Sequence, residues 1–221
     1  MVLGANGPDS LIWWEWVREH QDEILAKLQE HIELTVTSVF LGLLIAAPLA
    51  LLSIRRRWLY GPILSVGTVL YTIPSLAAFV LLIPFMERRT SAIVVLTSYT
   101  ILILVRNAVT GLDAVPADVK EAAEGMGYSS TRQLLRVELP IALPTIIAGI
   151  RLAVVTVIGL VTVAAIVGEG GLGDLINDGL RRNFPTPLVV GASLSVLLAV
   201  LCDFALLAVQ RIATPWQRKG R

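Results

Sequence analysis

Long apolar runs alternate with short polar stretches along the chain. Five runs are long enough to cross a bilayer as a helix, which takes about 20 residues, because no backbone polar group can stay unpaired in hydrocarbon. We place the predicted spans at residues 34–54, 60–85, 91–112, 143–168 and 187–210. The pattern predicts an all-α membrane protein with about five transmembrane helices and with its two termini on opposite faces.

A few charged residues interrupt these runs. The first two runs contain none, whereas the third contains Arg106, the fourth Arg151 and the fifth Asp203. An unpaired charge in hydrocarbon is costly, so we expect Asp203 to pair with one of the two arginines or to face a water-filled vestibule. A structural ion pair is favoured over an ion-coupling site.

The second span lies in a charge-free run from Trp58 to Met86 that contains a proline. Pro74 removes a backbone donor and can bend the helix, which commonly happens where a helix lines a cavity. Tyr71, Pro74 and Ser75 are therefore candidates for the wall of a path through the membrane. A proline bend that merely fits the bundle is the alternative.

The composition agrees with a membrane protein. Apolar residues make up 55% of the chain and charged residues 16%, against roughly 45–50% and 25% in soluble domains. The net charge of +1 says little about partners. Cys202 is the single cysteine, so no intramolecular disulfide can form.

The distribution of Lys and Arg predicts the orientation. With the N-terminus outside, twelve of the 18 Lys and Arg residues fall on the inner side and six on the outer side. Positive residues are enriched on the cytoplasmic side of membrane proteins. The sequence therefore predicts an N-out, C-in topology with a cytoplasmic loop at residues 113–140.

The residues before the first span hold three tryptophans beside acidic side chains. They lack the basic start and cleavage site of a signal peptide. We interpret Leu11 to Gln29 as a helix at the outer membrane interface, with packing on the bundle or a partner subunit as the alternative. The chain thus divides into an extracytoplasmic or interfacial segment (1–29), a membrane domain (30–210) and a basic cytoplasmic tail (211–221).

The loop at 113–140 is predicted to form two short helices. Gly125 or Gly127 can supply the left-handed stop of the first helix. Ala122 and Ala123 are expected on the surface of that helix, where small side chains would let a partner approach closely.

The second helix of the loop is predicted to begin at a capping box, Ser130 with Gln133, and to run towards Pro140. The fourth span would then begin separately, at residue 143.

The first loop helix and the residues after it carry a family resemblance. Seven positions match, with their spacing, the EAA signature of the permease subunits of bacterial binding-protein-dependent ABC importers of type I: Glu121, Ala122, Ala123, Gly127, Val137, Leu139 and Pro140. From about Gln29 to Gln210 the chain resembles the osmoprotectant permeases, for glycine betaine, carnitine or choline. Four stretches carry that wider resemblance: IPSLA at 73–77, VRN at 105–107, AGIR at 148–151 and GEGGLGD at 168–174.

The resemblance implies a multi-pass permease of the bacterial inner membrane that docks a separate ATPase through this loop. The ATPase, in two copies, would bind ATP and Mg²⁺, and no cofactor is implied in this chain, which has no G-x-x-x-x-G-K-[ST] phosphate loop. An extracytoplasmic binding protein would deliver the substrate. A second permease is also implied, with a heterodimer favoured and a homodimer open, together with membrane lipid but no nucleic acid.

The stretch GEGGLGD fits the spacing of a dinucleotide-binding loop, but that fingerprint follows a strand and precedes a carboxylate by about 20 residues. Here an apolar span precedes it, and Ser193 stands at the distant position. We interpret the stretch as a turn that forms an extracytoplasmic gate: Gly168, Glu169, Gly170, Gly171, Leu172 and Gly173. Leu172 is the candidate plug, and Glu169 or Asp174 would contact the binding protein. A tight turn without a gating role is the alternative.

The favoured function is a non-catalytic permease subunit that forms half of the translocation path for a small osmoprotectant. The alternative within the superfamily is a permease for methionine, ergothioneine or another amino-acid derivative. A channel or secondary transporter would need an internal repeat or a ring of pore-lining charges, and neither is evident. Catalytic and metal-binding residues are not predicted, because both histidines precede the first span and no Cys, His and carboxylate cluster occurs at depth.

Overall fold

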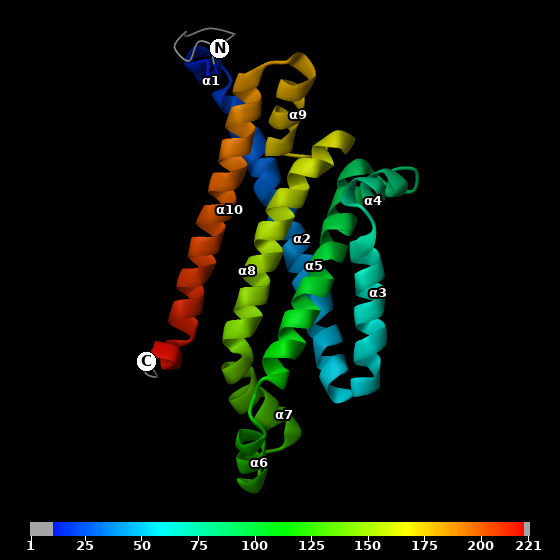
Figure 1. Ribbon diagram of the computed structural model, residues 1–221, viewed down its shortest axis with the longest axis vertical. Helices are drawn as coiled ribbons and strands as arrows, with labels where there is room; N and C mark the ends of the chain where they lie inside the picture. Colours follow the sequence, from blue (N-terminus) through cyan, green and yellow to red (C-terminus); the bar gives the residue numbers. More distant parts are fainter. Residues whose placement is uncertain (1–10, 219–221) are drawn as a thin grey trace.

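The chain folds into a bundle of long helices, seen in a computed structural model that describes residues 11–218 (Figure 1). No β strand occurs within those limits. Four helical runs are long and apolar enough to cross a membrane: α2 (Gln21–Arg55), α5 (Arg88–Asp113), the run 130–167 whose main part is α8 (Leu139–Ala164), and α10 (Pro185–Ala213). A bent pair, α3 (Tyr60–Thr72) with α4 (Ser75–Leu82), provides a fifth. The predicted all-α membrane fold is thereby confirmed.

Helix α5 lies in the middle of the bundle and packs on α2 and α8, while α10 packs on α8 at one edge (Figure 1). Buried apolar side chains fill the space between α2, α5 and α8. Glycines bring these helices close together. A Cβ on Gly42 would stand 2.4 Å from Thr100 Oγ1, and one on Gly149 would stand 2.4 Å from Asn107 Cβ. Such small residues permit the tight crossings on which membrane helix packing depends.

The N-terminal segment is not the single helix predicted over Leu11–Gln29. Helix α1 (Trp14–Glu19) ends at His20, and the residues from Gln21 onward belong to α2. The His20 ring stacks on Trp16, and its Nδ1 lies 2.9 Å from the Trp16 carbonyl oxygen. With 35 residues, α2 is about 52 Å long, roughly 20 Å more than a hydrocarbon core. Its polar first turns therefore extend beyond the predicted span.

The tryptophans of this segment contact the start of α10. The rings of Trp13 and Trp16 both pack edge-on against Phe184, and the Trp13 N–H donates to Thr186 Oγ1 over 2.9 Å. Trp13 and Trp16 therefore pack on the bundle, which is the alternative interpretation of this segment.

The second span bends at the predicted proline. Helices α3 and α4 meet at 89° across Ile73 and Pro74. Pro74 has no N–H with which to continue α3. The Ile73 carbonyl, at the break, accepts a hydrogen bond from the Tyr99 hydroxyl on α5. Residues 60–85 therefore form a corner, in which α3 covers only about 20 Å.

The sequence predicts that the fourth span begins after Pro140, and this prediction is wrong. The helix continues from α7 (Ser130–Gln133) through a π-helical turn at 134–138 into α8. The wider turn accommodates the ring and the missing N–H of Pro140. The predicted capping box is also wrong, because Ser129 is the N-cap without a side-chain bond and Gln133 is buried.

One helix was not predicted. Helix α9 (Leu172–Arg182) follows Gly171 and ends at Asn183, which has a positive φ of 53°. The Phe184 N–H donates to the Gly179 carbonyl over 2.9 Å, the bond expected of a left-handed helix stop. α9 lies with α1 at one end of the bundle, the α9 end, and α6 and α7 lie at the other, the α6 end (Figure 1).

Candidate functional site

The loop at the α6 end consists of α6 (Ala117–Gly125), a sharp turn and α7. Gly127 has φ +78°. Its N–H donates to the Glu124 carbonyl over 2.9 Å, and the Tyr128 N–H donates to the Ala123 carbonyl over 3.2 Å. This pair of bonds forms a Schellman motif, whose left-handed residue is usually glycine. Gly127 is therefore the stop, and Gly125 lies inside the helix.

The exposed face of α6 differs in one residue from the face that the sequence predicts. Glu121 and Ala122 are exposed, whereas Ala123 is only 1% exposed. The prediction that both alanines lie on the helix surface is wrong for Ala123, because α6 packs against the turn at 134–138 and the loop closes over this side chain. The face open to a partner contains Glu121 and Ala122.

Polar contacts fasten the loop to the bundle. Arg57, which follows α2, donates through Nη1 to Asp113 Oδ2 at the end of α5 over 2.8 Å. Lys120 Nζ donates to the Leu112 carbonyl over 3.3 Å and lies 3.8 Å from the Glu138 carboxylate. The remaining matched positions are half-buried where the loop enters α8: Val137, Leu139 and Pro140. The orientation of α6 is thus tied to α5 and α8.

The glycine turn, residues 168–173, lies in close contact with α8 and α2. Gly168 and Gly171 have positive φ values of 84° and 51°. A Cβ on Gly170 would stand 2.3 Å from Ala165 Cα, and one on Gly171 would stand 2.7 Å from the His31 backbone nitrogen. Backbone therefore meets backbone where no side chain fits.

Leu172, the candidate plug, is fully buried. It packs with Ile24 and Leu175 in an apolar cluster between α2 and α9, beside Leu194 of α10. In this conformation the side chain holds α9 against its neighbours and is not open to a path.

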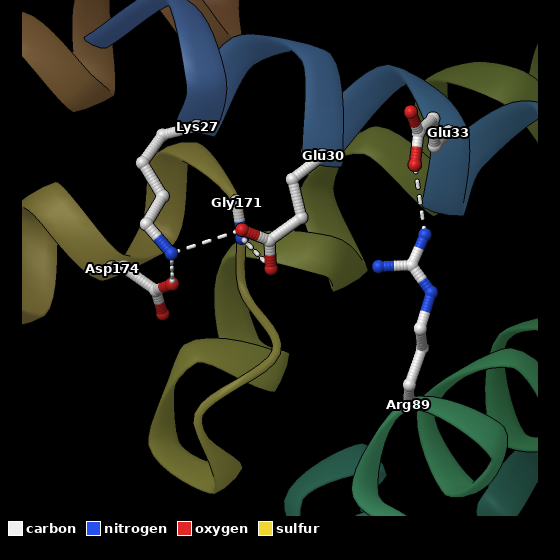
Figure 2. Close-up of polar contacts among 6 residues, drawn as sticks. All are labelled: Lys27, Glu30, Glu33, Arg89, Gly171 and Asp174. Atoms are coloured by element: carbon white, nitrogen blue, oxygen red, sulfur yellow. Dashed lines mark hydrogen bonds and ion pairs between the residues drawn. The ribbon is translucent and has the colours of Figure 1, made fainter. Parts of the chain in front are cut away.

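Charged side chains of α2 hold the glycine turn in place (Figure 2). Lys27 Nζ lies 2.6 Å from Asp174 Oδ2 and 2.9 Å from Glu30 Oε2. The Gly171 N–H donates to Glu30 Oε1 over 3.4 Å. Asp174, a candidate contact for a binding protein, is therefore already paired within the chain.

Glu169 lies half-buried beside this network. Burial raises the pKa of its carboxyl above the ordinary range, and the Glu30 carboxylate adds to the increase. Arg89, which opposes the increase, also donates to Glu33 Oε2 over 2.8 Å. The turn thus carries a carboxyl that holds its proton more tightly than an exposed one.

A cavity of about 900 Å³ lies beside the glycine turn. Aromatic and charged side chains line it, among them Trp16, His20, Arg88, Asp178, Arg181 and Phe184. The cavity gives the α9 end a concave polar surface of the size that small ligands occupy.

The candidate path residues lie at the corner between α3 and α4. Tyr71 is exposed, Pro74 precedes α4, and Ser75 begins α4 half-buried. The Tyr71 ring lies 5.1 Å from that of Tyr99, centroid to centroid. Tyr99 fastens the corner through Ile73, a role that the sequence pattern did not indicate, because its partner lies 26 residues away.

Asp203 of α10 pairs with Arg151 of α8. The guanidinium donates through Nε and Nη2 to the two carboxylate oxygens over 2.9 and 2.8 Å. Its Nη1 donates to Gln210 Oε1 over 3.2 Å, and Gln210 donates to the Pro144 carbonyl over 3.3 Å. Arg106, the other candidate partner, is exposed on α5 and makes no polar contact within the described residues. Gln210 is the third residue of this polar group, and its polar side chain at the end of a predicted span was the sequence feature that could have indicated it.

Residues 11–218 contain no group of three His, Cys, Asp or Glu side chains placed to hold a metal ion. His31 is fully buried, and its Nε2 lies 3.1 Å from the Ile158 carbonyl oxygen. It therefore joins α2 to α8 beneath the glycine turn.

Residues 38–218 match the protein family described as the binding-protein-dependent transport system inner membrane component. The osmoprotectant import permease protein OsmW of Salmonella typhimurium (strain LT2) is 40% identical over 84% of this chain and 89% of its own length. The glycine betaine/carnitine/choline transport system permease protein OpuCB of Bacillus subtilis (strain 168) is 35% identical, over 90% and 92%. A chain of the MetNI methionine ABC transporter, solved in inward-facing conformations, superposes with a TM-score of 0.76 at 24% identity, covering 86% of this chain and 96% of its own.

Proposed function

The chain belongs to the family of binding-protein-dependent transport system inner membrane components, and we propose that it carries a small osmoprotectant into the cell, powered by a separate ATPase. Members of the family are non-catalytic membrane subunits, and this chain is a multi-pass inner-membrane protein. Glycine betaine, choline and carnitine are the proposed substrates, because the similar permeases are named for osmoprotectants and for these compounds.

The observation that carries the proposal is the loop at the α6 end. A short helix with Glu121 and Ala122 on its open face ends in the Schellman turn at Gly127, and Lys120 fastens this helix to the Leu112 carbonyl near the end of α5. A helix held in this way can transmit a push to the spans. We propose that the ATPase docks on this open face, and that closure of two ATPases rocks two permeases from inward-open to outward-open.

The orientation follows the same proposal. The α6 end would face the cytoplasm, where the ATPase and its ATP and Mg²⁺ are, and the α9 end would face outward. The excess of Lys and Arg on the α6 side supports this orientation.

At the α9 end, the binding protein would release the substrate near the cavity beside the glycine turn. We propose that residues 168–173 form the outer gate and that Tyr71, Pro74 and Ser75 border the path. The gate would move together with α2 and α9, because Leu172 and Asp174 of α9 contact side chains of α2. One chain supplies half of a path, so a second permease is required, and we favour a related chain over an identical copy.

The substrate class is tested on the extracytoplasmic binding protein that would serve this permease. Calorimetric titration with glycine betaine, choline and carnitine should give saturable binding, and titration with methionine and ergothioneine should give none. Binding of methionine or ergothioneine alone would replace the osmoprotectant assignment and leave the permease assignment intact.

A further inference from the structure

A hollow of about 490 Å³ opens between α8 and α10, at the Arg151–Asp203 pair. Arg151 lies about 18 Å along α8 from Leu139, and Asp203 lies about 15 Å from the last residue of α10. The hollow is therefore well inside the spans. Apolar side chains form the rest of its wall, including Leu152, Val155 and Val200.

The two charges of the pair retain capacity for a further partner. A guanidinium has five N–H donors, and Arg151 uses three, two for Asp203 and one for Gln210. The other two find no acceptor among residues 11–218. The Arg151 and Asp203 side chains remain 23% and 37% exposed. Charges at this depth rarely face lipid, so the hollow is expected to face water or protein.

An aromatic ring completes the wall. Phe204 follows Asp203, lines the same hollow and is 63% exposed. The face of an aromatic ring attracts a quaternary ammonium group without needing hydrogen bonds. A guanidinium with free donors attracts a carboxylate. The hollow thus places a group for an anion beside two groups for a cation.

We propose that this hollow binds a small zwitterion during translocation, with Arg151 contacting its carboxylate and with Asp203 and Phe204 contacting its quaternary ammonium group. This inference rests on the proposed function, since the hollow would be an intermediate binding site for the substrate within the spans. Its volume lies within the range of small-molecule sites, about 300–1,000 Å³.

The test is direct binding of radiolabelled glycine betaine to the purified permease–ATPase complex, without the binding protein, in nanodiscs of phosphatidylglycerol and cardiolipin. The competitor 3,3-dimethylbutanoate has the same shape and carboxylate but a neutral carbon in place of nitrogen. We expect glycine betaine to bind roughly tenfold more tightly than this isostere. Equal affinities for glycine betaine and the isostere would show that no group of the site recognises the positive charge, and would overturn the proposal.

Two variants separate a binding role from a structural one. Phe204→Leu keeps an apolar side chain, and Asp203→Asn keeps the shape, yet each should reduce the preference for glycine betaine over the isostere to about threefold or less. The matched control is Phe40→Leu, since Phe40 is an exposed phenylalanine of α2 outside the hollow, at 58%. If Asp203→Asn lowers the melting temperature while the preference stays as in the wild type, the pair only joins α8 to α10.

Two further results distinguish a solute site in the hollow from a lipid site and from a hollow that binds nothing. Loss of glycine betaine binding in nanodiscs of phosphatidylcholine would identify the lipid headgroup as the occupant and overturn the assignment to a solute. If the binding protein binds glycine betaine and uptake proceeds, but the complex alone binds none, this inference fails and the proposed function stands.

Discussion

Gly125 and Gly127 lie two residues apart at the end of α6, but only one of them requires glycine. Nothing lies within 4 Å of a Cβ added at either position, yet only Gly127 has a positive φ, of 78°. Gly127→Ala should therefore cost about 1–2 kcal/mol of loop stability through backbone strain. Gly125→Ala should be neutral or stabilising, because alanine favours helix.

Co-purification of the ATPase with each glycine variant tests this difference between Gly125 and Gly127. We expect Gly127→Ala to retain less ATPase than the wild type, Gly127→Asn to recover part of the loss, and Gly125→Ala to bind normally. Equal retention by all three would mean that the Schellman turn does not shape the docking face.

The raised pKa of Glu169 should make the stability of the glycine turn depend on pH. Burial and the carboxylates of Glu30 and Asp174 raise its pKa in the folded chain, against the opposing effects of Arg89 and Lys27. The folded state therefore holds this proton to a higher pH than the unfolded state does. The resulting stabilisation is complete below the ordinary pKa near 4.5 and is lost as the pH rises through the raised value.

Replacing this carboxyl should remove the effect. The melting temperature of Glu169→Gln should match that of the wild type below about pH 4.5 and exceed it progressively towards neutral pH. A Glu169→Gln difference that is constant with pH would contradict the pKa shift.

At the scale of elements, the corner between α3 and α4 depends on a side chain of a third helix. Tyr99→Phe removes the hydrogen bond to the Ile73 carbonyl and should lower the free energy of unfolding by about 1 kcal/mol. Tyr71→Phe should have almost no effect, because the Tyr71 hydroxyl makes no hydrogen bond within the described residues. Denaturant titration in detergent measures both, and equal losses would mean that the hydroxyl of Tyr99 does not hold the corner.

Elements that depend on local pattern could be predicted from the sequence, and elements that depend on distant partners could not. The apolar runs locate the spans, and Pro74 locates the bend. Helix α9 was missed because its stability comes from Leu172 and Leu175 packing on α2, which a short amphipathic run does not reveal. Pro140 misled the prediction because a π-helical turn lets the helix continue.

In the candidate sites too, features that depend on local sequence could be predicted, and features that depend on distant partners could not. A left-handed stop is local, so the sequence predicts that α6 ends at a glycine, but it leaves Gly125 and Gly127 open, and the positive φ of Gly127 decides between them. That Ala123 is buried, and that Arg151 rather than Arg106 meets Asp203, depends on how the elements pack. The contact between Gly171 and His31 joins positions 140 residues apart, so no local pattern could have indicated it.

At the scale of the whole molecule, the two ends of the bundle should lie on opposite sides of the inner membrane. In a Cys202→Ser background, Leu180→Cys at the α9 end should react with a membrane-impermeant maleimide added to intact cells, because Leu180 is exposed. Ser130→Cys at the α6 end should react only after the cells are opened. The reverse pattern would invert the proposed orientation.

Import of an osmoprotectant by this chain should require an ATPase that acts through the α6 loop. The most direct measurement is uptake of radiolabelled glycine betaine by vesicles that contain the permease pair and its ATPase, with ATP inside and the binding protein outside. We predict saturable uptake that needs both ATP and the binding protein and that falls at least about tenfold in Ala122→Asp, which places a charge on the open face of α6. Uptake that persists without ATP, or that is unchanged in Ala122→Asp, would show that an ATPase docked on α6 does not drive import.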